Sequence, residues 1–351
     1  MRVAPYVNDA TRNENVAGAT FPRPAKWSKP MKRMVHWICA VVLTALAAAA
    51  AAQHYPTKPI RLIMPNAPGS ANDTLGRIVA AHLGEALGQQ IVMDNRAGAG
   101  GLLGMEIGKN SAPDGYTLVA ASTAAMSIAP HIYKKLAYDP LNDFEFISLY
   151  AATPNVLVVN ATVPAKNMKE WLEWVKANGN SLNMASAGPG SQSHLTGVAL
   201  LTEAGLQSTH VPYKGGGASV ASVVAGESQW TITPAPAVMA LIKGGRLRAL
   251  GQSLPQRTPL LPDVPSIKES VPAFDYSGWN GLLAPKGTPK AILTRLRTKL
   301  IEVANQAPLK EQFALQGAQV VTATPEEFRK FVQQEIQSTG KVVRAAGLKV
   351  E

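Results

Sequence analysis

The segment NMASAGPGSQSHLTG, residues 183–197, joins a short apolar stretch to a helical pattern through a turn of small residues. A glycine-rich turn at the start of a helix is typical of an anion site, because backbone N–H groups converge there. The turn has no lysine at the place where a nucleotide phosphate would need one. These residues therefore predict a strand, a turn and a helix that hold an anion other than a nucleotide.

A second junction of the same kind, IMPNAPGSANDTLGR at residues 63–77, lies about 120 residues earlier in the chain. Ligands of open α/β sheets bind at the carboxyl ends of strands, against helix N-termini. If each of two domains supplies one junction, the two helix N-termini face each other across a cleft. Unpaired N–H donors and partial positive charge at both would suit a carboxylate without arginine or lysine. The alternative is that both are ordinary α/β loops, with Asp73 acting as a helix cap.

Short apolar runs alternate with helical patterns along most of the chain. The 351 residues are enough for about two domains. Apolar residues at helical spacing predict helices within 75–86, 168–175, 292–303 and 328–336. This alternation predicts an α/β fold with largely parallel sheets. Strands are expected at 59–65, 90–95, 116–122, 155–160, 182–187, 209–213, 230–233 and 247–252.

The stretch MKRMVHWICAVVLTALAAAAAAQ, residues 31–53, has the order of a secretory signal peptide. A basic start precedes an apolar run and an alanine-rich end, so we expect export to the periplasm with cleavage near residue 52. The alternative is an uncleaved anchor, since the apolar run is just long enough to span a bilayer. Residues 1–30 carry no hydrophobic pattern and are expected to be a non-native or disordered extension, the true start being Met31 or Met34.

Charge and cysteine content narrow the class of function. Of 34 Lys/Arg and 23 Asp/Glu, seven and two lie in residues 1–52, which leaves a net charge of +6. The basic residues are scattered without interleaved aromatics, so no nucleic-acid partner is expected. Because Cys39, the only cysteine, lies in the predicted signal peptide, the mature chain should have no disulfide, thiolate nucleophile or sulfur-ligated metal.

Two further motifs favour structural roles. The segment DNRAGAGGLLG, residues 94–104, does not have the spacing of a dinucleotide-binding loop and predicts a tight turn. His194 follows Ser191 by three residues, and a serine next to a histidine suggests a serine hydrolase. The sequence has no G-x-S-x-G elbow, however, and no acid placed to orient the histidine ring. The histidines show no metal-binding spacing. We therefore expect no catalytic residue, no metal and no cofactor.

Eight segments occur in an order that is specific to one family, although each alone is weak. They are YPTKPIRLIMPNAPGSANDTLGR, QQIVMDNRAGAGGLLG, APDGYTLVAAS, YDPLNDFEFISL, ASAGPGSQSHL, HVPYKGGG, LPDVPS and WNGLLAPKGTP. Over about residues 55–351, the chain resembles the Bug-type (TctC-like) substrate-binding receptors of tripartite tricarboxylate transporters.

This resemblance implies a two-lobed periplasmic-binding-protein fold, a Venus flytrap of type II-like topology, with a mostly parallel sheet in each lobe. Lobe 1 would comprise residues 55–153 plus 277–351 and lobe 2 residues 154–276, with chain crossings near 153 and 276. It also implies a non-catalytic receptor that captures a small organic acid and delivers it to membrane permease subunits. We expect this receptor to be a monomer. A sensory receptor that feeds a signalling system, or an exported Ser/His hydrolase, remains as an alternative.

The resemblance also implies where the ligand binds, at the residues given at the end of the next paragraph.

Two departures from the family pattern bear on the ligand. Asn66 and Ser70 replace an aromatic residue and a glycine, which predicts a more polar ligand than an aromatic acid. Thr233 stands where relatives often have an acidic or amide residue, which argues against amino-acid ligands. The implied ligand-binding residues are Asn66, Ala67, Gly69, Ser70, Asp73, Ser122, Thr123, Ser186, Gly190, Ser191, His194, Tyr213, Gly215 and Thr233.

Overall fold

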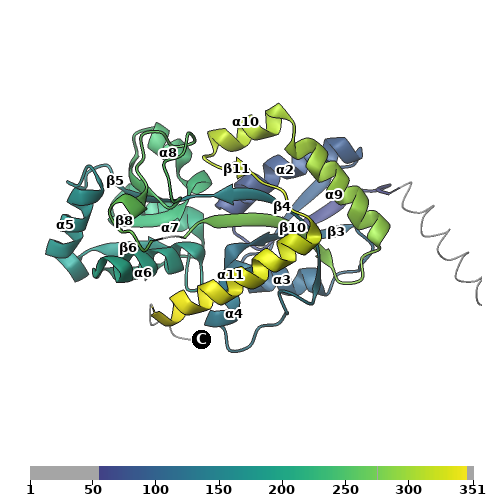
Figure 1. Cartoon of the computed structure of the whole chain (residues 1–351), viewed down its shortest axis with the longest axis horizontal. Helices are drawn as coiled ribbons and strands as arrows, with labels where there is room; N and C mark the ends of the chain where they lie inside the picture. Colours follow the sequence, from purple (N-terminus) through teal and green to yellow (C-terminus); the bar gives the residue numbers. More distant parts are fainter. Residues whose placement is uncertain (1–54, 275, 346–351) are drawn as a thin grey trace, which may run out of the picture. The chain divides into compact units, whose positions relative to one another are not determined.

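The structure of the protein is a computed structural model that describes residues 55–274 and 276–345. All of these residues belong to one compact unit (Figure 1). The predicted extension (1–30), the signal peptide (31–52) and Cys39 lie outside the described residues. Within the described part of the chain, no helix combines the length and the apolar character that a membrane crossing requires.

The first sheet has six strands in the order β11-β4-β10-β3-β1-β2. Strand β1 pairs in parallel with β2 and β3, whereas β10 runs antiparallel to both β3 and β4, and β11 runs antiparallel to β4. The strands are β1 (Ile60–Met64), β2 (Ile91–Asn95), β3 (Thr117–Ser122), β4 (Phe144–Thr153), β10 (Gly278–Pro285) and β11 (Gln319–Val320).

The second sheet has five strands in the order β7-β6-β8-β5-β9. Strand β6 is parallel to β7 and β8, and β5 is antiparallel to β8 and β9. The strands are β5 (Asn155–Asn160), β6 (Asn183–Ser186), β7 (Thr209–Pro212), β8 (Trp230–Pro234) and β9 (Leu247–Gln252). Only Pro154 separates β4 of the first sheet from β5 of the second, so the chain passes directly from one sheet to the other.

The predicted α/β two-lobed fold is confirmed, but the prediction of mostly parallel sheets is wrong, because both sheets are mixed. A helix between two strands of one sheet gives a parallel pair. Strands β5 and β10 instead enter their sheets from the other sheet, without such a crossover, and pair antiparallel with their neighbours.

Strand β10 was absent from the predicted strands, as were β4 and β11. Its sequence, GWNGLLAP, contains two glycines and a proline, which are depleted in strands. The glycines are needed because neighbouring side chains lie against the backbone. A Cβ on Gly281 would lie 2.3 Å from the ring of Phe328, and one on Gly278 would lie 2.3 Å from the amide nitrogen of Gln192.

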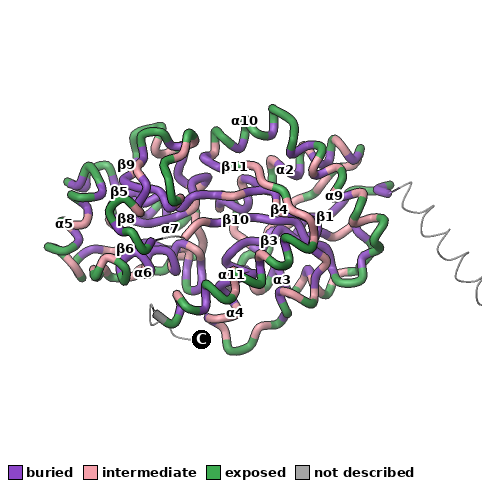
Figure 2. Tube along the Cα trace, viewed as in Figure 1, coloured by how far each residue is buried: buried purple, intermediate pink, exposed green. Residues whose placement is uncertain are grey.

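Helices cover both faces of each sheet and complete the core. Leu75 of α2, Leu300 of α9 and Phe313 of α10 pack in one cluster against the first sheet, and Phe328 of α11 packs on its other face. Trp171 of α5 and Trp230 of β8 meet edge to face in the second lobe. Figure 2 shows the buried strands between helices whose outer faces are exposed. The longer helices are α2 (Ala71–Leu87), α3 (Leu102–Lys109), α5 (Met168–Asn178), α6 (Gln192–Ala204), α7 (Gly216–Ala225), α9 (Lys290–Ala304), α10 (Ala307–Leu315) and α11 (Pro325–Ala345).

Shorter helical turns connect these elements. The N-terminus of α11 has a capping box, since the Glu327 N–H donates to Thr324 Oγ1 and the Thr324 N–H donates to Glu327 Oε2. The turns are η1 (Ala99–Gly101), η2 (Ala124–Ile128), α4 (Ala129–Ile132), η3 (Gly179–Ser181), η4 (Ala235–Ala237), α8 (Met239–Lys243) and η5 (Ile267–Glu269).

Candidate functional site

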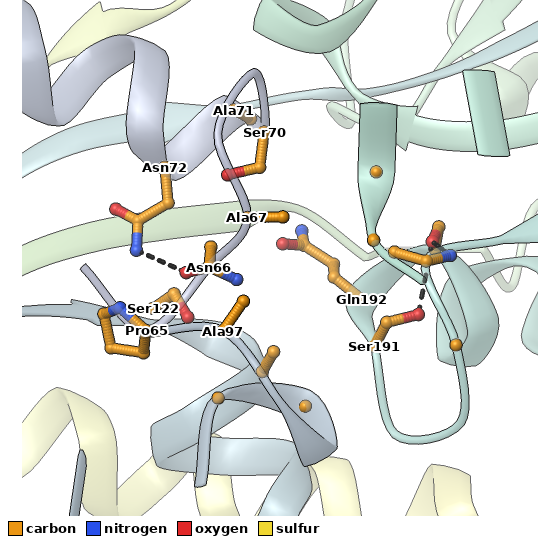
Figure 3. Close-up of a pocket in the computed structure, with 18 of the residues that line it drawn as sticks. Pro65, Asn66, Ala67, Ser70, Ala71, Asn72, Ala97, Ser122, Ser191 and Gln192 are labelled. Atoms are coloured by element: carbon orange, nitrogen blue, oxygen red, sulfur yellow. Dashed lines mark hydrogen bonds between the residues drawn. The ribbon is translucent and has the colours of Figure 1, made fainter. Parts of the chain in front are cut away.

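A cavity of about 540 Å³ lies between the carboxyl-terminal ends of strands from the two sheets. The first sheet contributes the turn after β1 and the end of β3, and the second contributes the turns after β6 and β7 and the end of β8. In Figure 3, Asn66, Ala67 and Ser70 lie on one side, with Ser191 and Gln192 across from them. The strand–turn–helix junctions of the sequence thus meet at one cavity.

The N-terminus of α2 reaches this cavity with free backbone donors. Ser70 is its N-cap, because its Oγ accepts from the Asp73 N–H and its carbonyl from the Thr74 N–H. Among the described residues, no group accepts a hydrogen bond from the N–H of Ala71 or Asn72. Both residues line the cavity, so two orphan donors of the helix N-terminus are available to a ligand.

The N-terminus of α6 repeats this arrangement from the second lobe. Ser191 is the N-cap, and its Oγ accepts the His194 N–H at 3.2 Å. Ser193 Oγ accepts the Ala187 N–H at 2.9 Å, which holds the preceding turn. In the described part of the chain, the N–H groups of Gln192 and Ser193 have no acceptor, and both residues line the cavity. Two helix N-termini from different lobes therefore present four unpaired N–H groups to one space.

The β7–α7 turn closes this space on a further side. Gly215 has φ +108°, a left-handed conformation that favours glycine, and a Cβ there would lie 2.9 Å from the Cβ of Ala67 in the opposite lobe. Lys214 in the same turn is exposed, and it is the only described lining residue with a charged side chain. The rest of the wall is made of glycine, alanine and proline residues together with amide and hydroxyl-bearing residues, which include the rings of Tyr133 and Tyr213.

A buried hydroxyl adds a further group without a partner. Ser122, at the end of β3, is 6% exposed and lines the cavity. Its Oγ has no hydrogen-bond partner among the described residues. A buried hydroxyl without a partner is unfavourable, so a ligand atom or a water at this position would satisfy it.

Asp73 does not line the cavity but holds the β1–α2 turn in place. Its side chain is 4% exposed, and its Oδ2 accepts from the Gly69 N–H and from Arg77 Nε, each at 3.0 Å. Its Oδ1 accepts from Asn95 Nδ2 at 2.8 Å. Burial alone would raise the pKa of Asp73, but these hydrogen bonds and the charge of Arg77 hold it below its usual value. Asp73 is therefore an ionised positioning residue.

His194 also lies outside the cavity lining, because its ring turns toward the edge strand β7. It stacks on His210 with the ring centroids 4.0 Å apart, and its Nδ1 accepts the Gly190 N–H at 3.4 Å. His210 Nε2 is 2.6 Å from Ser186 Oγ. Burial, with a smaller effect of His210, lowers the pKa of His194 to about 4. In the described structure no hydrogen bond joins the His194 ring to the hydroxyl of Ser191 or Ser193, so the hydrolase pairing is not assembled.

The ligand-binding residues predicted from the sequence fall into two groups, those that line the cavity and those that do not. Thr123 does not line it, and its Oγ1 accepts the Trp279 N–H at 3.1 Å. The predicted residues that line the cavity are Asn66, Ala67, Ser70, Ser122, Ser191, Tyr213, Gly215 and Thr233. Those that do not are Gly69, Asp73, Thr123, Ser186, Gly190 and His194.

Several lining residues were missed by the sequence analysis. Thr153 and Asn280 lie on strands β4 and β10, which were not predicted, whereas Asn72 is the second residue of α2 and Gln192 the first residue of α6. Gly98, Gly100 and Gly101, in a segment expected only to form a tight turn, also contribute to the lining. Among the described residues, no group of three or more histidine, cysteine, aspartate or glutamate side chains is arranged to hold a metal ion.

Comparisons with known proteins, over most of the chain, point to the same family as the sequence motifs do. Residues 75–348 match the family model described as the tripartite tricarboxylate transporter family receptor, TctC. Protein BugT of Bordetella pertussis is 35% identical over 324 residues, covering 92% of this chain and 99% of that protein.

Solved structures show the same fold. The periplasmic binding protein BugD is 30% identical with a TM-score of 0.81, over 85% of this chain and all of that one. MatC from Rhodopseudomonas palustris with bound malate is 30% identical with a TM-score of 0.77, over 82% of this chain and all of that one. The chain therefore belongs to the TctC family of tripartite tricarboxylate transporter receptors, of the Bug type.

Proposed function

We propose that this protein is an exported receptor that captures a small organic acid between its two lobes and delivers it to a tripartite tricarboxylate-type membrane transporter. The observation that supports this most is the pair of facing helix N-termini, with unpaired N–H groups at Ala71, Asn72, Gln192 and Ser193. Lobe 1 comprises residues 55–153 and 277–351, and lobe 2 comprises residues 154–276. Permease subunits of the transporter are the proposed partners, and the receptor acts as a periplasmic monomer.

Magnitudes favour a carboxylate held by these N–H groups. A hydrogen bond from an uncharged donor to a charged acceptor contributes roughly 1.5–3 kcal/mol, and a partly buried helix N-terminus up to about 2 kcal/mol. Several such contacts are needed to offset the desolvation of a carboxylate. The free donors of α2 and α6 supply them from both lobes, so the anion is best held when the lobes are together.

The cavity wall favours a polar ligand. Asn66 stands at the wall where the family pattern has an aromatic residue, and Thr233 contributes a hydroxyl opposite. No described lining residue is acidic, so an ammonium group would have no counter-charge there. The relative MatC was solved with malate, a polar carboxylate. We therefore propose aliphatic, non-aromatic acids without an amino group as ligands.

Thermal unfolding of the mature protein against a panel of carboxylates tests this function. A ligand at 100 times its dissociation constant should add about 2.7 kcal/mol of apparent stability. Aliphatic hydroxy- and dicarboxylates should stabilise more than benzoate-type acids, aspartate or glutamate. Absence of stabilisation by every carboxylate would refute the proposed function.

A matched pair of glycine variants places the effect in the cavity. Gly215→Val puts a side chain against Ala67 across the lobes and should abolish the stabilisation by ligand. Gly226 has a similar positive φ of +83°, but a Cβ there has only Asn160 Nδ2 within 4.0 Å. Gly226 has ψ 2°, the ordinary left-handed turn conformation, against 168° at Gly215, so Gly226→Val is a milder backbone change that should keep the ligand response.

A further inference from the structure

A buried tyrosine fixes the orientation of three asparagine side chains that line the cavity. Tyr150 of β4 is 2% exposed, and its hydroxyl donates to Asn72 Oδ1 at 2.7 Å. This is the only hydrogen bond of the hydroxyl among the described residues. Burial raises the pKa of Tyr150, so the phenol keeps its proton and must donate it. Asn72 therefore has to turn its oxygen toward Tyr150.

This constraint passes from Asn72 to the neighbouring asparagines. Asn72 Oδ1 also accepts from Asn280 Nδ2 at 2.9 Å, and Asn72 Nδ2 donates to Asn66 Oδ1 at 2.8 Å (Figure 3). If the three amides were all turned round, their mutual bonds would survive, but the Tyr150 proton would lose its acceptor in a buried place. The phenol thus selects one of two otherwise equivalent arrangements.

The selected arrangement gives the cavity wall a defined polarity. Asn66 uses its oxygen toward Asn72, so its Nδ2 is left as a donor. Asn280 uses its nitrogen, so its Oδ1 is left as an acceptor. In the described structure neither free group has a hydrogen-bond partner, and both residues line the cavity. Of the two asparagines that bond Asn72, Asn66 therefore offers an uncharged donor to the cavity and Asn280 an uncharged acceptor.

We propose that Asn280 is a specificity-determining residue whose Oδ1 accepts the proton of a ligand hydroxyl, so that the receptor selects hydroxycarboxylates over their deoxy analogues. This rests on the proposed carboxylate-binding function and adds the chemical class of the ligand. A carboxylate alone offers only acceptors and would leave Asn280 Oδ1 without a donor. An ammonium would satisfy it, but no described lining residue is acidic, and Asp73 is engaged by Gly69, Arg77 and Asn95.

Calorimetric titration with matched acid pairs tests the proposal. The pairs are glycolate and acetate, lactate and propionate, malate and succinate, 2-hydroxyglutarate and glutarate, and citrate and tricarballylate, with aspartate as the amino counterpart of malate. In the best-binding pair, the hydroxy acid should bind at least tenfold more tightly than its partner. Asn280→Leu keeps the branched four-atom shape of the side chain but removes the Oδ1 acceptor, together with the Nδ2 donor to Asn72, and should bring this ratio close to one.

Tyr150→Phe tests whether the hydrogen bond of the phenol, and not the packing of its ring, sets the preference for hydroxy acids. The variant keeps the ring but removes the donor that fixes the amides, so the hydroxy-to-deoxy ratio should fall at least threefold while the deoxy acid binds about as before. Tyr55→Phe is the matched control, because Tyr55 is also buried and donates to the Gly115 carbonyl at 2.6 Å, away from the cavity lining. Its ratio should equal that of the wild type.

The outcomes distinguish this proposal from the function on which it rests. Equal binding of both members of the best pair, an unchanged ratio in Asn280→Leu, or tighter binding of aspartate than of malate would overturn the selection for a hydroxyl while leaving carboxylate capture in place. Absence of binding by all the acids would overturn both.

Discussion

Asp73→Ala should lower the free energy of unfolding by about 3 kcal/mol and weaken carboxylate binding at least tenfold, although Asp73 does not line the cavity. The variant removes the acceptor of the Gly69 N–H, Arg77 and Asn95 at a nearly inaccessible position. Arg77 is half exposed and can be rehydrated, so the cost is smaller than the sum of the lost bonds. The released turn would no longer hold Ala71 and Asn72 toward the ligand.

Urea unfolding and calorimetric titration of the same variant would measure both effects. Asp139→Ala is the matched control, because Asp139 also organises a turn, by accepting from the N–H groups of Leu141 and Asn142, but it is exposed and away from the cavity. The control should bind ligand as the wild type does. Wild-type affinity in Asp73→Ala would contradict a positioning role for this carboxylate.

Acidification from pH 7 to pH 4 should remove up to about 3 kcal/mol of stability through His194 alone. Burial and the stacked His210 lower its pKa to about 4 in the folded state, against 6.5 for the free side chain. The unfolded chain therefore binds the proton first as the pH falls. The stability from the neutral ring is complete above about pH 6.5 and is lost progressively down to about pH 4. Burial also lowers the pKa of His210, which acts in the same direction.

Denaturant unfolding at several pH values would test this, with His194→Phe as the diagnostic variant. Phenylalanine keeps a ring against His210 but cannot titrate, so the loss of stability between pH 6.5 and 4 should shrink. Equal slopes in the wild type and His194→Phe would show that the stacked pair does not govern acid stability.

The features that the sequence predicted well depend on residues that are close to one another in the sequence. The turns at 63–77 and 183–197 combine small residues, a serine N-cap and a following apolar helix face, and each of these signals lies within one turn of the chain. Ser70 and Ser191 are indeed the N-caps of α2 and α6. What the two helices share, a common cavity, required the assumption of two facing domains and the family resemblance.

The missed features depend on contacts between distant segments. Strand β10 contains glycines because Phe328 and Gln192 occupy the space of their side chains, and local propensity cannot show this. Without β4 and β10, the link from Tyr150 through Asn72 to Asn280 could not be foreseen, since its members are 78 and 208 residues apart. His194 was expected at the ligand from the family resemblance, but its ring stacks on His210 and does not line the cavity.

A crystal structure with the tightest-binding carboxylate would test most directly whether facing helix N-termini hold the anion. We expect its carboxylate oxygens within hydrogen-bond distance of the free N–H groups at the starts of α2 and α6, at Ala71 and Asn72 on one side and at Gln192 and Ser193 on the other. A carboxylate bound by Lys214 alone, or bound outside this cavity, would contradict that expectation.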